Sequence, residues 1–114
     1  MPVRQSRSTR LTVVKLGGEL LENASRLRKL TLALAKRSSQ EPIVIVHGGG
    51  REVDADMAKH GIVKSSVDGL RITNKETLPI VVGVLAGRVN TQLVAALVYA
   101  VSYTHLTLPT SDLV

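Results

Sequence analysis

The sequence predicts an α/β fold, a three-layer αβα sandwich around a mainly parallel sheet, truncated and carrying a small β-hairpin. Apolar strand-like runs alternate with segments of helical periodicity, which is typical of a layered fold with a parallel sheet. A strand–glycine–helix unit also occurs twice. The chain has 114 residues, of which 44% are hydrophobic, so it is long enough to bury a core.

The first half of the chain contains two predicted strands and one predicted helix. Residues 11–16 form a short apolar run that Gly17 and Gly18 end, as expected for a strand. A helix follows over residues 19–37, because Leu27, Leu30 and Leu34 fall at helical spacing. The second strand, residues 43–46, is a continuous apolar run, which predicts a parallel strand covered on both faces.

A helix is predicted next over residues 51–61, after three consecutive glycines. Val53 and Met57 share one helical face, and acidic residues lie in its first turns. Gly61 is suited to the C-terminal cap, because glycine adopts the left-handed backbone conformation at low cost.

The second half of the chain predicts a hairpin and a long helix. Asp68 and Gly69 form a turn signal between apolar positions, which indicates a small hairpin. A helix is expected from Asn74, with its start delayed or bent by Pro79, and it continues to Ala100. Its apolar face is marked by Val89, Leu93 and Leu97.

The net charge of +6 is an N-terminal feature. Residues 1–40 carry nine Lys/Arg and two acids, which gives +7, whereas residues 41–114 carry six Lys/Arg and seven acids, which gives −1. We therefore expect residues 1–10 to be a disordered basic leader, with a basic arm for an acidic partner as the alternative. Phe and Trp are absent, so the stacking platforms of single-strand nucleic-acid binders are missing, and no nucleic-acid partner is predicted.

Cysteine content and hydropathy predict a cytoplasmic protein. There is no cysteine, which fits a reducing compartment. The N-terminus lacks the apolar segment of a signal peptide. The longest apolar stretch, residues 80–100, is interrupted by Arg88, Asn90 and Gln92, so we predict no membrane span.

The glycines of the two repeated units predict an anion site. Ligands bind beyond the carboxyl ends of parallel strands, where glycine lets backbone N–H groups and a helix N-terminus approach an anion. Lys15, two residues before the first glycine pair, would add a positive charge. Taken singly, each glycine run is equally well explained as a tight turn between a strand and a helix.

The sequence also bears on several other types of site. The P-loop and dinucleotide fingerprints are absent. The "HGGG" segment would suit the oxyanion hole of a serine esterase, but no G-x-S-x-G elbow occurs. His47 would serve as a general base or metal ligand, although a hydrogen-bonded structural role is favoured. Arg71 is able to clamp a carboxylate, or it is a solvated surface group.

Four segments, "VVKLGGELL", "IVIVHGGGREVD", "VDGLRIT" and "VLAGRVNTQLVAAL", together resemble the amino-acid kinase family, and within it the acetylglutamate kinases of arginine biosynthesis. The resemblance implies ATP-dependent phosphorylation of the side-chain carboxylate of N-acetyl-L-glutamate to an acyl phosphate. It also implies Mg²⁺ with the ATP and a homo-oligomer. Alternatives are an aspartate, glutamate, carbamate or UMP kinase, which "VDGLRIT" disfavours, and a non-catalytic anion-binding module.

The resemblance also implies roles for individual residues. Lys15 matches the lysine that stabilises the transferring phosphoryl group, and Arg71 matches the arginine that binds a substrate carboxylate. The glycines that lie against the phosphates are matched by Gly17 and Gly18. The loop whose backbone contacts acetylglutamate and the phosphoryl group is matched by Gly48, Gly49 and Gly50. No metal ligand is implied.

The resemblance ends near residue 97. We therefore expect residues 11–100 to be the N-terminal, substrate-side part of an amino-acid kinase domain. Residues 101–110, "VSYTHLTLPT", match one reading frame of a common transposase-type sequencing adapter, so residues 101–114 are predicted to be a non-native tail. A natural β-strand with a polar terminus is the alternative. The chain alone is expected to be incomplete and inactive.

Overall fold

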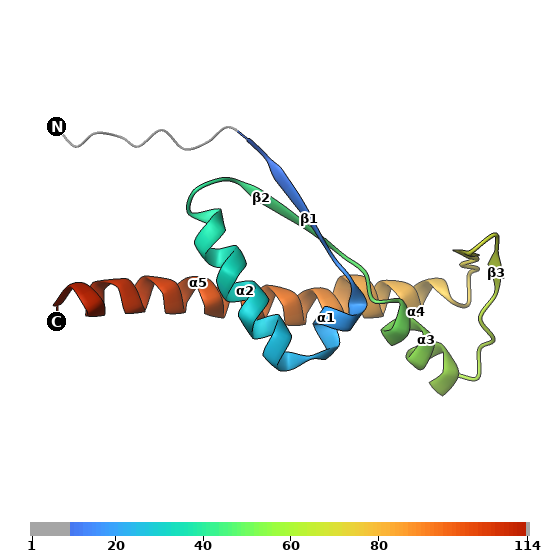
Figure 1. The fold of residues 1–114 in the computed structure, drawn as a ribbon. Coiled ribbons are helices and arrows are strands. Elements are labelled where there is room, and N and C mark those ends of the chain that lie inside the picture. The colour runs from blue at the N-terminus through green and yellow to red at the C-terminus, as the bar shows by residue number, and fades with distance from the viewer. Residues whose placement is uncertain (1–9, 114) are drawn as a thin grey trace.

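The computed structural model describes residues 10–113, and the side chains of residues 10–104. The predicted leader, residues 1–10, lies outside the described residues except for Arg10. The elements, in chain order, are β1 (Thr12–Leu16), α1 (Gly18–Glu22), α2 (Ala24–Ser38), β2 (Ile43–His47), α3 (Gly50–Lys59), β3 (Ser66–Val67), β4 (Leu70–Arg71), α4 (Leu78–Val82), the π-helix η1 (Gly83–Val89) and α5 (Asn90–Leu113) (Figure 1).

Strands β1 and β2 form the predicted parallel pair. Their register runs from Thr12 opposite Ile43 to Leu16 opposite His47. Helices α2 and α5 lie on one side of the pair (Figure 1). Side chains on the other side are exposed, with Val44 at 46% and Val46 at 48%. The α/β fold with a parallel pair is confirmed, but the expectation that residues 43–46 are covered on both faces is wrong within the part of the chain described.

The predicted helix over residues 19–37 is two helices, α1 and α2, that meet at Asn23. The Asn23 side chain accepts a hydrogen bond of 3.0 Å from the backbone N–H of Arg26, which is the usual contact of an N-terminal cap. Asn23 therefore ends one helix and begins the next. Of the predicted stripe on α2, Leu34 is buried and the other two leucines are half-buried.

Helix α3 has the predicted inner face and forms the centre of the core. Val53 and Met57 are 1% and 2% exposed, and they pack with Val84 and Val89 of η1. The helix is followed by Gly61 at φ +67°, a left-handed conformation that suits glycine. The cap residue itself is His60, and Gly61, directly after it, has the predicted left-handed conformation.

The hairpin and the start of the long helix agree with the predictions from the sequence. Asp68 and Gly69 have φ values of 52° and 76° between the antiparallel strands β3 and β4, as in a type I′ turn. The Asn74 side chain accepts a hydrogen bond of 2.9 Å from the N–H of Thr77. Helix α4 begins only at Leu78, with Pro79 in its first turn, so the expected delay is confirmed.

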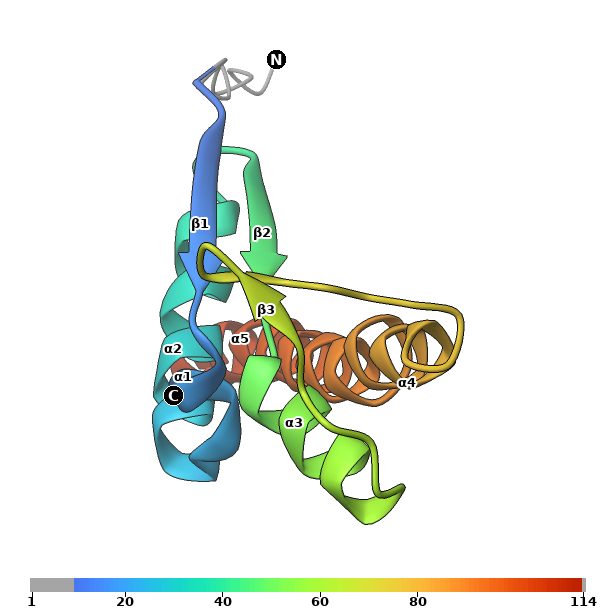
Figure 2. The ribbon, with the colours of Figure 1, turned by 90° about the vertical axis from the view of Figure 1, so that its right-hand side faces the viewer.

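Helices α4, η1 and α5 form one continuous rod that crosses beneath the strand pair (Figures 1 and 2). By length and composition alone, Leu78–Thr104 would be able to cross a membrane, and 17% of its most apolar window is buried. Arg88 and Asn90 in its middle instead hydrogen-bond to α3 and β2. Helix α5 continues through the predicted tail to Leu113, and the origin of that tail stays a prediction.

Candidate functional site

The two glycine turns lie against each other at one end of the parallel strands. The N–H of Gly48 donates a hydrogen bond of 3.2 Å to the carbonyl of Leu16. A Cβ atom added at Gly18 would lie 3.7 Å from Cα of Gly49, so the second turn closely approaches the first. The structure therefore brings together the glycines that the sequence placed at two separate strand ends.

Within the glycine triplet, packing explains only the middle residue. Gly49 is buried, and a Cβ atom there would lie 2.8 Å from Cδ2 of Leu85 and 3.4 Å from a methyl group of Val89. A Cβ atom added at Gly48 or at Gly50 would have no atom of another segment within 4 Å. The backbone of these outer glycines can therefore be approached closely by a ligand, whereas Gly49 lets η1 pack on the turn.

Lys15 projects from the uncovered face of the strand pair. It lies opposite Val46 in the register, and both side chains are exposed. The exposed lysine lies at the glycine end of the sheet, where it is free to reach a bound anion.

His47 is hydrogen-bonded in place, as the sequence analysis favoured. Its Nδ1 lies 3.0 Å from the carbonyl oxygen of Gly48, and its Nε2 lies 3.2 Å from Oδ1 of Asn90. A carbonyl oxygen only accepts, so Nδ1 donates in this contact. Nε2 of the same neutral ring then accepts, which the Asn90 amide satisfies when its nitrogen is turned toward the ring. Asn90 is the first residue of α5, and no sequence pattern around it indicates a contact with the glycine turn.

Two sets of ion pairs fix the helix that begins at the triplet. Arg51 of α3 contacts Glu19 and Glu22 of α1 at 2.8 and 3.5 Å. On another side of α3, Arg88 of η1 contacts its acids at 3.1 and 3.4 Å, and these acids are Glu52 and Asp56. Each exposed pair stabilises the fold by at most about 1 kcal/mol, but together they orient α3 relative to both neighbours.

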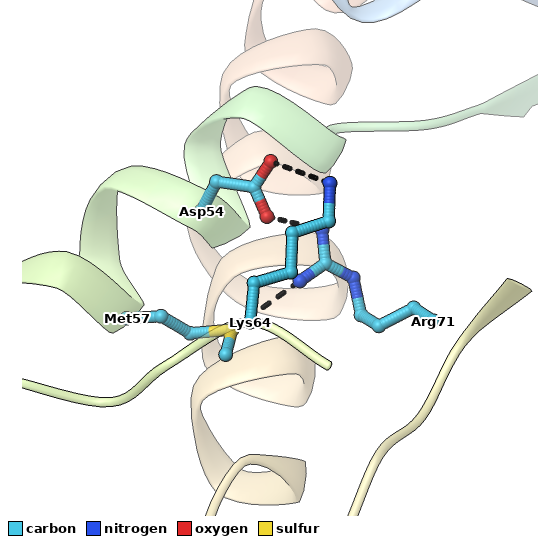
Figure 3. Close-up of polar contacts among 4 residues, drawn as sticks. All are labelled: Asp54, Met57, Lys64 and Arg71. Carbon is cyan, nitrogen blue, oxygen red and sulfur yellow. Dashed lines mark hydrogen bonds and ion pairs between the residues drawn. The ribbon is translucent and has the colours of Figure 1, made fainter. Parts of the chain in front are cut away.

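Arg71 is held against α3 and is not a solvated surface group. Its Nη2 pairs with Oδ1 of Asp54, and its Nη1 lies 3.3 Å from Sδ of Met57 (Figure 3). Lys64 contacts the other carboxylate oxygen of Asp54 at 3.4 Å. Asp54 lies four residues after Gly50, about 6 Å along the helix axis. We call Arg71, Asp54 and Lys64 the Arg71 cluster. Through Asp54, this cluster lies about one helical turn from the glycine triplet.

The Arg71 cluster also predicts that the stability of the fold is sensitive to acid. The hydrogen bond from Arg71 lowers the pKa of Asp54 from its ordinary value of 3.8. A carboxyl group whose pKa is lower in the folded protein stabilises the fold at pH values above its ordinary pKa. This contribution is lost as the pH falls through the folded-state pKa. Between pH 5 and pH 2, the free energy of unfolding should fall less in Asp54→Asn than in the unmodified protein. We expect the difference between the two proteins to be below about 1 kcal/mol. Urea denaturation at both pH values measures the difference.

The control for this prediction is Asp56→Asn on the same helix. This variant removes a carboxylate that contacts Arg88 at 3.4 Å and lies outside the Arg71 contacts, so it should keep the pH dependence of the unmodified protein. An identical acid response in the Asp54→Asn variant would contradict the prediction. Glu41, whose pKa is lowered by hydrogen bonds from Arg37 and Thr12, contributes equally in all three proteins.

Among the described residues, no three His, Cys, Asp or Glu side chains lie together as a metal site. The acids near the glycine turns are engaged by arginine and lysine. The described part of the chain therefore brings together two glycine turns and an arginine held by Asp54 and Met57.

The family model described as the amino acid kinase family matches residues 10–110. The chain belongs to the amino acid kinase family. Membership confirms the resemblance found in the sequence and decides against a serine esterase. The matched range overlaps the predicted tail, residues 101–114, without testing its origin.

The curated relatives of this chain include acetylglutamate kinases. The one from Chloroflexus aurantiacus is 40% identical over 92 residues, covering 81% of this chain and 35% of the relative. The one from Moritella profunda is 47% identical over 85 residues, covering 73% of this chain and 32% of the relative. The chain thus spans about one third of the length of these relatives.

Solved structures with the same fold support the assignment. The N-acetylglutamate synthase of Neisseria gonorrhoeae, solved with coenzyme A and N-acetyl-glutamate, is 28% identical with a TM-score of 0.66. The match covers 79% of this chain and 21% of the synthase. The amino acid kinase fold predicted from the sequence is therefore confirmed.

Proposed function

We propose that the protein is an acetylglutamate kinase that uses ATP to phosphorylate the side-chain carboxylate of N-acetyl-L-glutamate. The observation that carries the proposal is the contact between the two glycine turns, about one helical turn from the Arg71 cluster. A phosphate cradle beside a carboxylate-binding group suits phosphoryl transfer to a carboxylate. The names of the curated relatives and the acetylglutamate bound by the synthase support this substrate.

The residues of this chain would act by positioning and charge. Phosphoryl transfer leaves little covalent work to the protein, so catalysis depends on alignment and on stabilising negative charge. Backbone N–H groups of the two turns and the N-terminus of α3 would bind phosphoryl oxygens. Lys15 would reach the transferring group from the uncovered face of the sheet, and Arg71 would hold a second carboxylate of the acceptor.

The nucleotide is accounted for only in part by the described residues. The glycine turns fit phosphate oxygens, but these residues do not provide a metal site, so Mg²⁺ would be held by other groups. We propose that the remaining nucleotide contacts lie outside residues 10–104, and that the 114-residue chain alone does not turn over ATP. A homo-oligomer and a cytoplasmic location complete the proposal.

Replacement of Arg71 tests the substrate. In the protein expressed from its complete open reading frame, Arg71→Ala should raise the KM for acetylglutamate about 10- to 100-fold, because a charged hydrogen-bond partner is lost. The value of kcat should change much less. Steady-state assays with varied acetylglutamate and saturating ATP measure both constants.

The matched control is Arg51→Ala, which removes an exposed, ion-paired arginine from α3. This variant should keep the KM of the unmodified enzyme. Absence of acetylglutamate-dependent ATP turnover in the unmodified protein would refute the proposed function, and an unchanged KM in Arg71→Ala would refute the role of Arg71.

A further inference from the structure

We propose that Asp54 is a positioning residue for Arg71, and that Lys64 offsets the charge of Asp54 at the carboxylate contact that the proposed function gives to Arg71. The inference rests on the proposed function and deepens it. It assigns a role to two residues, Asp54 and Lys64, that no sequence motif predicts to be functional.

The contacts of Arg71 leave it able to bind a ligand. A guanidinium group carries five N–H donors. Within residues 10–104, one nitrogen contacts the Asp54 carboxylate, and another lies against Met57 sulfur, which is a weak acceptor. The arginine is thus held through its two Nη atoms. Its remaining N–H groups are available for a bidentate contact with a carboxylate.

Charge balance explains the presence of Lys64. Arg71 and Asp54 alone would sum to zero, and Asp54 would repel an incoming carboxylate. Lys64 lies 3.4 Å from the second Asp54 oxygen and restores a net charge of +1 to the cluster. Figure 3 shows the lysine and the arginine meeting the same carboxylate from two segments. A cluster of this charge suits a single carboxylate group.

The position of the cluster distinguishes it from the other ion pairs of α3. The Arg71 side chain is 21% exposed, whereas those of Arg51 and Arg88 are 64% and 43% exposed. Its contact with Met57 joins it to the buried core, because Met57 is 2% exposed. Asp54 lies on the helix that starts at the glycine triplet. An arginine fixed in this way would keep a constant distance from the phosphate cradle.

The experiment compares kinetic constants of Asp54→Ala, Asp54→Glu and Lys64→Ala in the protein expressed from its complete open reading frame. We expect Asp54→Ala to raise the KM for acetylglutamate about 10-fold while kcat and the KM for ATP stay near their unmodified values. Lys64→Ala should raise the same KM, and Asp54→Glu should restore part of the loss. The control, Asp56→Asn, removes a carboxylate that pairs with Arg88, and it should behave as the unmodified protein.

Two results would overturn the inference. One is an acetylglutamate KM in Asp54→Ala equal to that of the unmodified enzyme. The other is a parallel change in kcat and both KM values with a lowered melting temperature, which indicates a purely structural ion pair. Calorimetry with N-acetyl-L-glutamate separates the two proposals if the unmodified protein gives no turnover. Binding that Asp54→Ala weakens would keep the role of Asp54 and reject the kinase, and absence of binding would reject both.

Discussion

In the protein expressed from its complete open reading frame, Lys15→Ala is expected to lower kcat for acetylglutamate-dependent ATP turnover by about 10²- to 10³-fold, the range seen when one group that stabilises developing charge is removed. The side chain is exposed on the open face of the sheet, so the free energy of unfolding should stay within about 0.5 kcal/mol. Turnover assays and urea denaturation of the same preparation measure the two effects. This separation is the reason that Lys15 is the most informative single position.

The matched control is Lys29→Ala on α2, which also removes an exposed lysine and should leave turnover unchanged. Lys15→Arg keeps the charge with a different shape, and it should recover only part of the activity because arginine and lysine present their donors differently. Turnover in Lys15→Ala equal to that of the Lys29→Ala control would show that Lys15 does not face the transferring group.

Gly49→Ala is expected to destabilise the protein by about 1–3 kcal/mol, the usual cost of overpacking a tight site. The new methyl group would meet Leu85 at 2.8 Å and Val89 at 3.4 Å, so η1 or the turn must shift. A shift of about 1 Å at a phosphate cradle can also lower activity about 100-fold. Thermal or urea denaturation measures the first effect and the kinase assay measures the second.

The neighbouring residue in the triplet provides the control. Gly50 begins α3, is exposed, and has open space where a Cβ atom would lie. Gly50→Ala should therefore be neutral or should stabilise by up to about 1 kcal/mol, because alanine favours the helix. If Gly50→Ala still impairs turnover, its backbone lies against a ligand. Equal destabilisation by the two substitutions would contradict the packing role of Gly49.

The fold was predictable wherever local chemistry determines it. The strand starting near Leu11, the turn at Asp68 and Gly69, and the delay imposed by Pro79 each depend on a few adjacent residues. The Asn23 break was missed because the leucine stripe suggested one continuous helix, although asparagine is a common N-terminal cap. The π-helix was missed because a helical periodicity of apolar residues does not distinguish i→i+4 from i→i+5 hydrogen bonding.

The larger error of the prediction from sequence was that residues 43–46 would be covered on both faces of the sheet. A run of apolar residues such as 43–46 predicts a buried strand, but it contains no information about which segment covers each face. The described residues provide helices for one face only, and Val44 and Val46 are exposed on the other. Coverage depends on contacts distant in sequence, which periodicity does not encode.

The candidate site was predictable as a set of positions but not as a set of contacts. Parallel strands required the two glycine turns to end at one edge, and the structure brings them together. The Arg71–Asp54 pair and the His47–Asn90 contact join residues 17 and 43 positions apart. A charged residue four positions after the triplet, in the order "GREVD", was the available signal for Asp54.

The long rod contacts both neighbours of the second glycine turn through two residues that are close in sequence. Arg88, in the last turn of η1, contacts Glu52 and Asp56 of α3. Asn90, two positions later, contacts His47 of β2. Residues two positions apart on a helix differ by about 200° around its axis, so the rod uses two of its sides here. The strand before the turn and the helix after it are therefore both held by one short segment of the same rod.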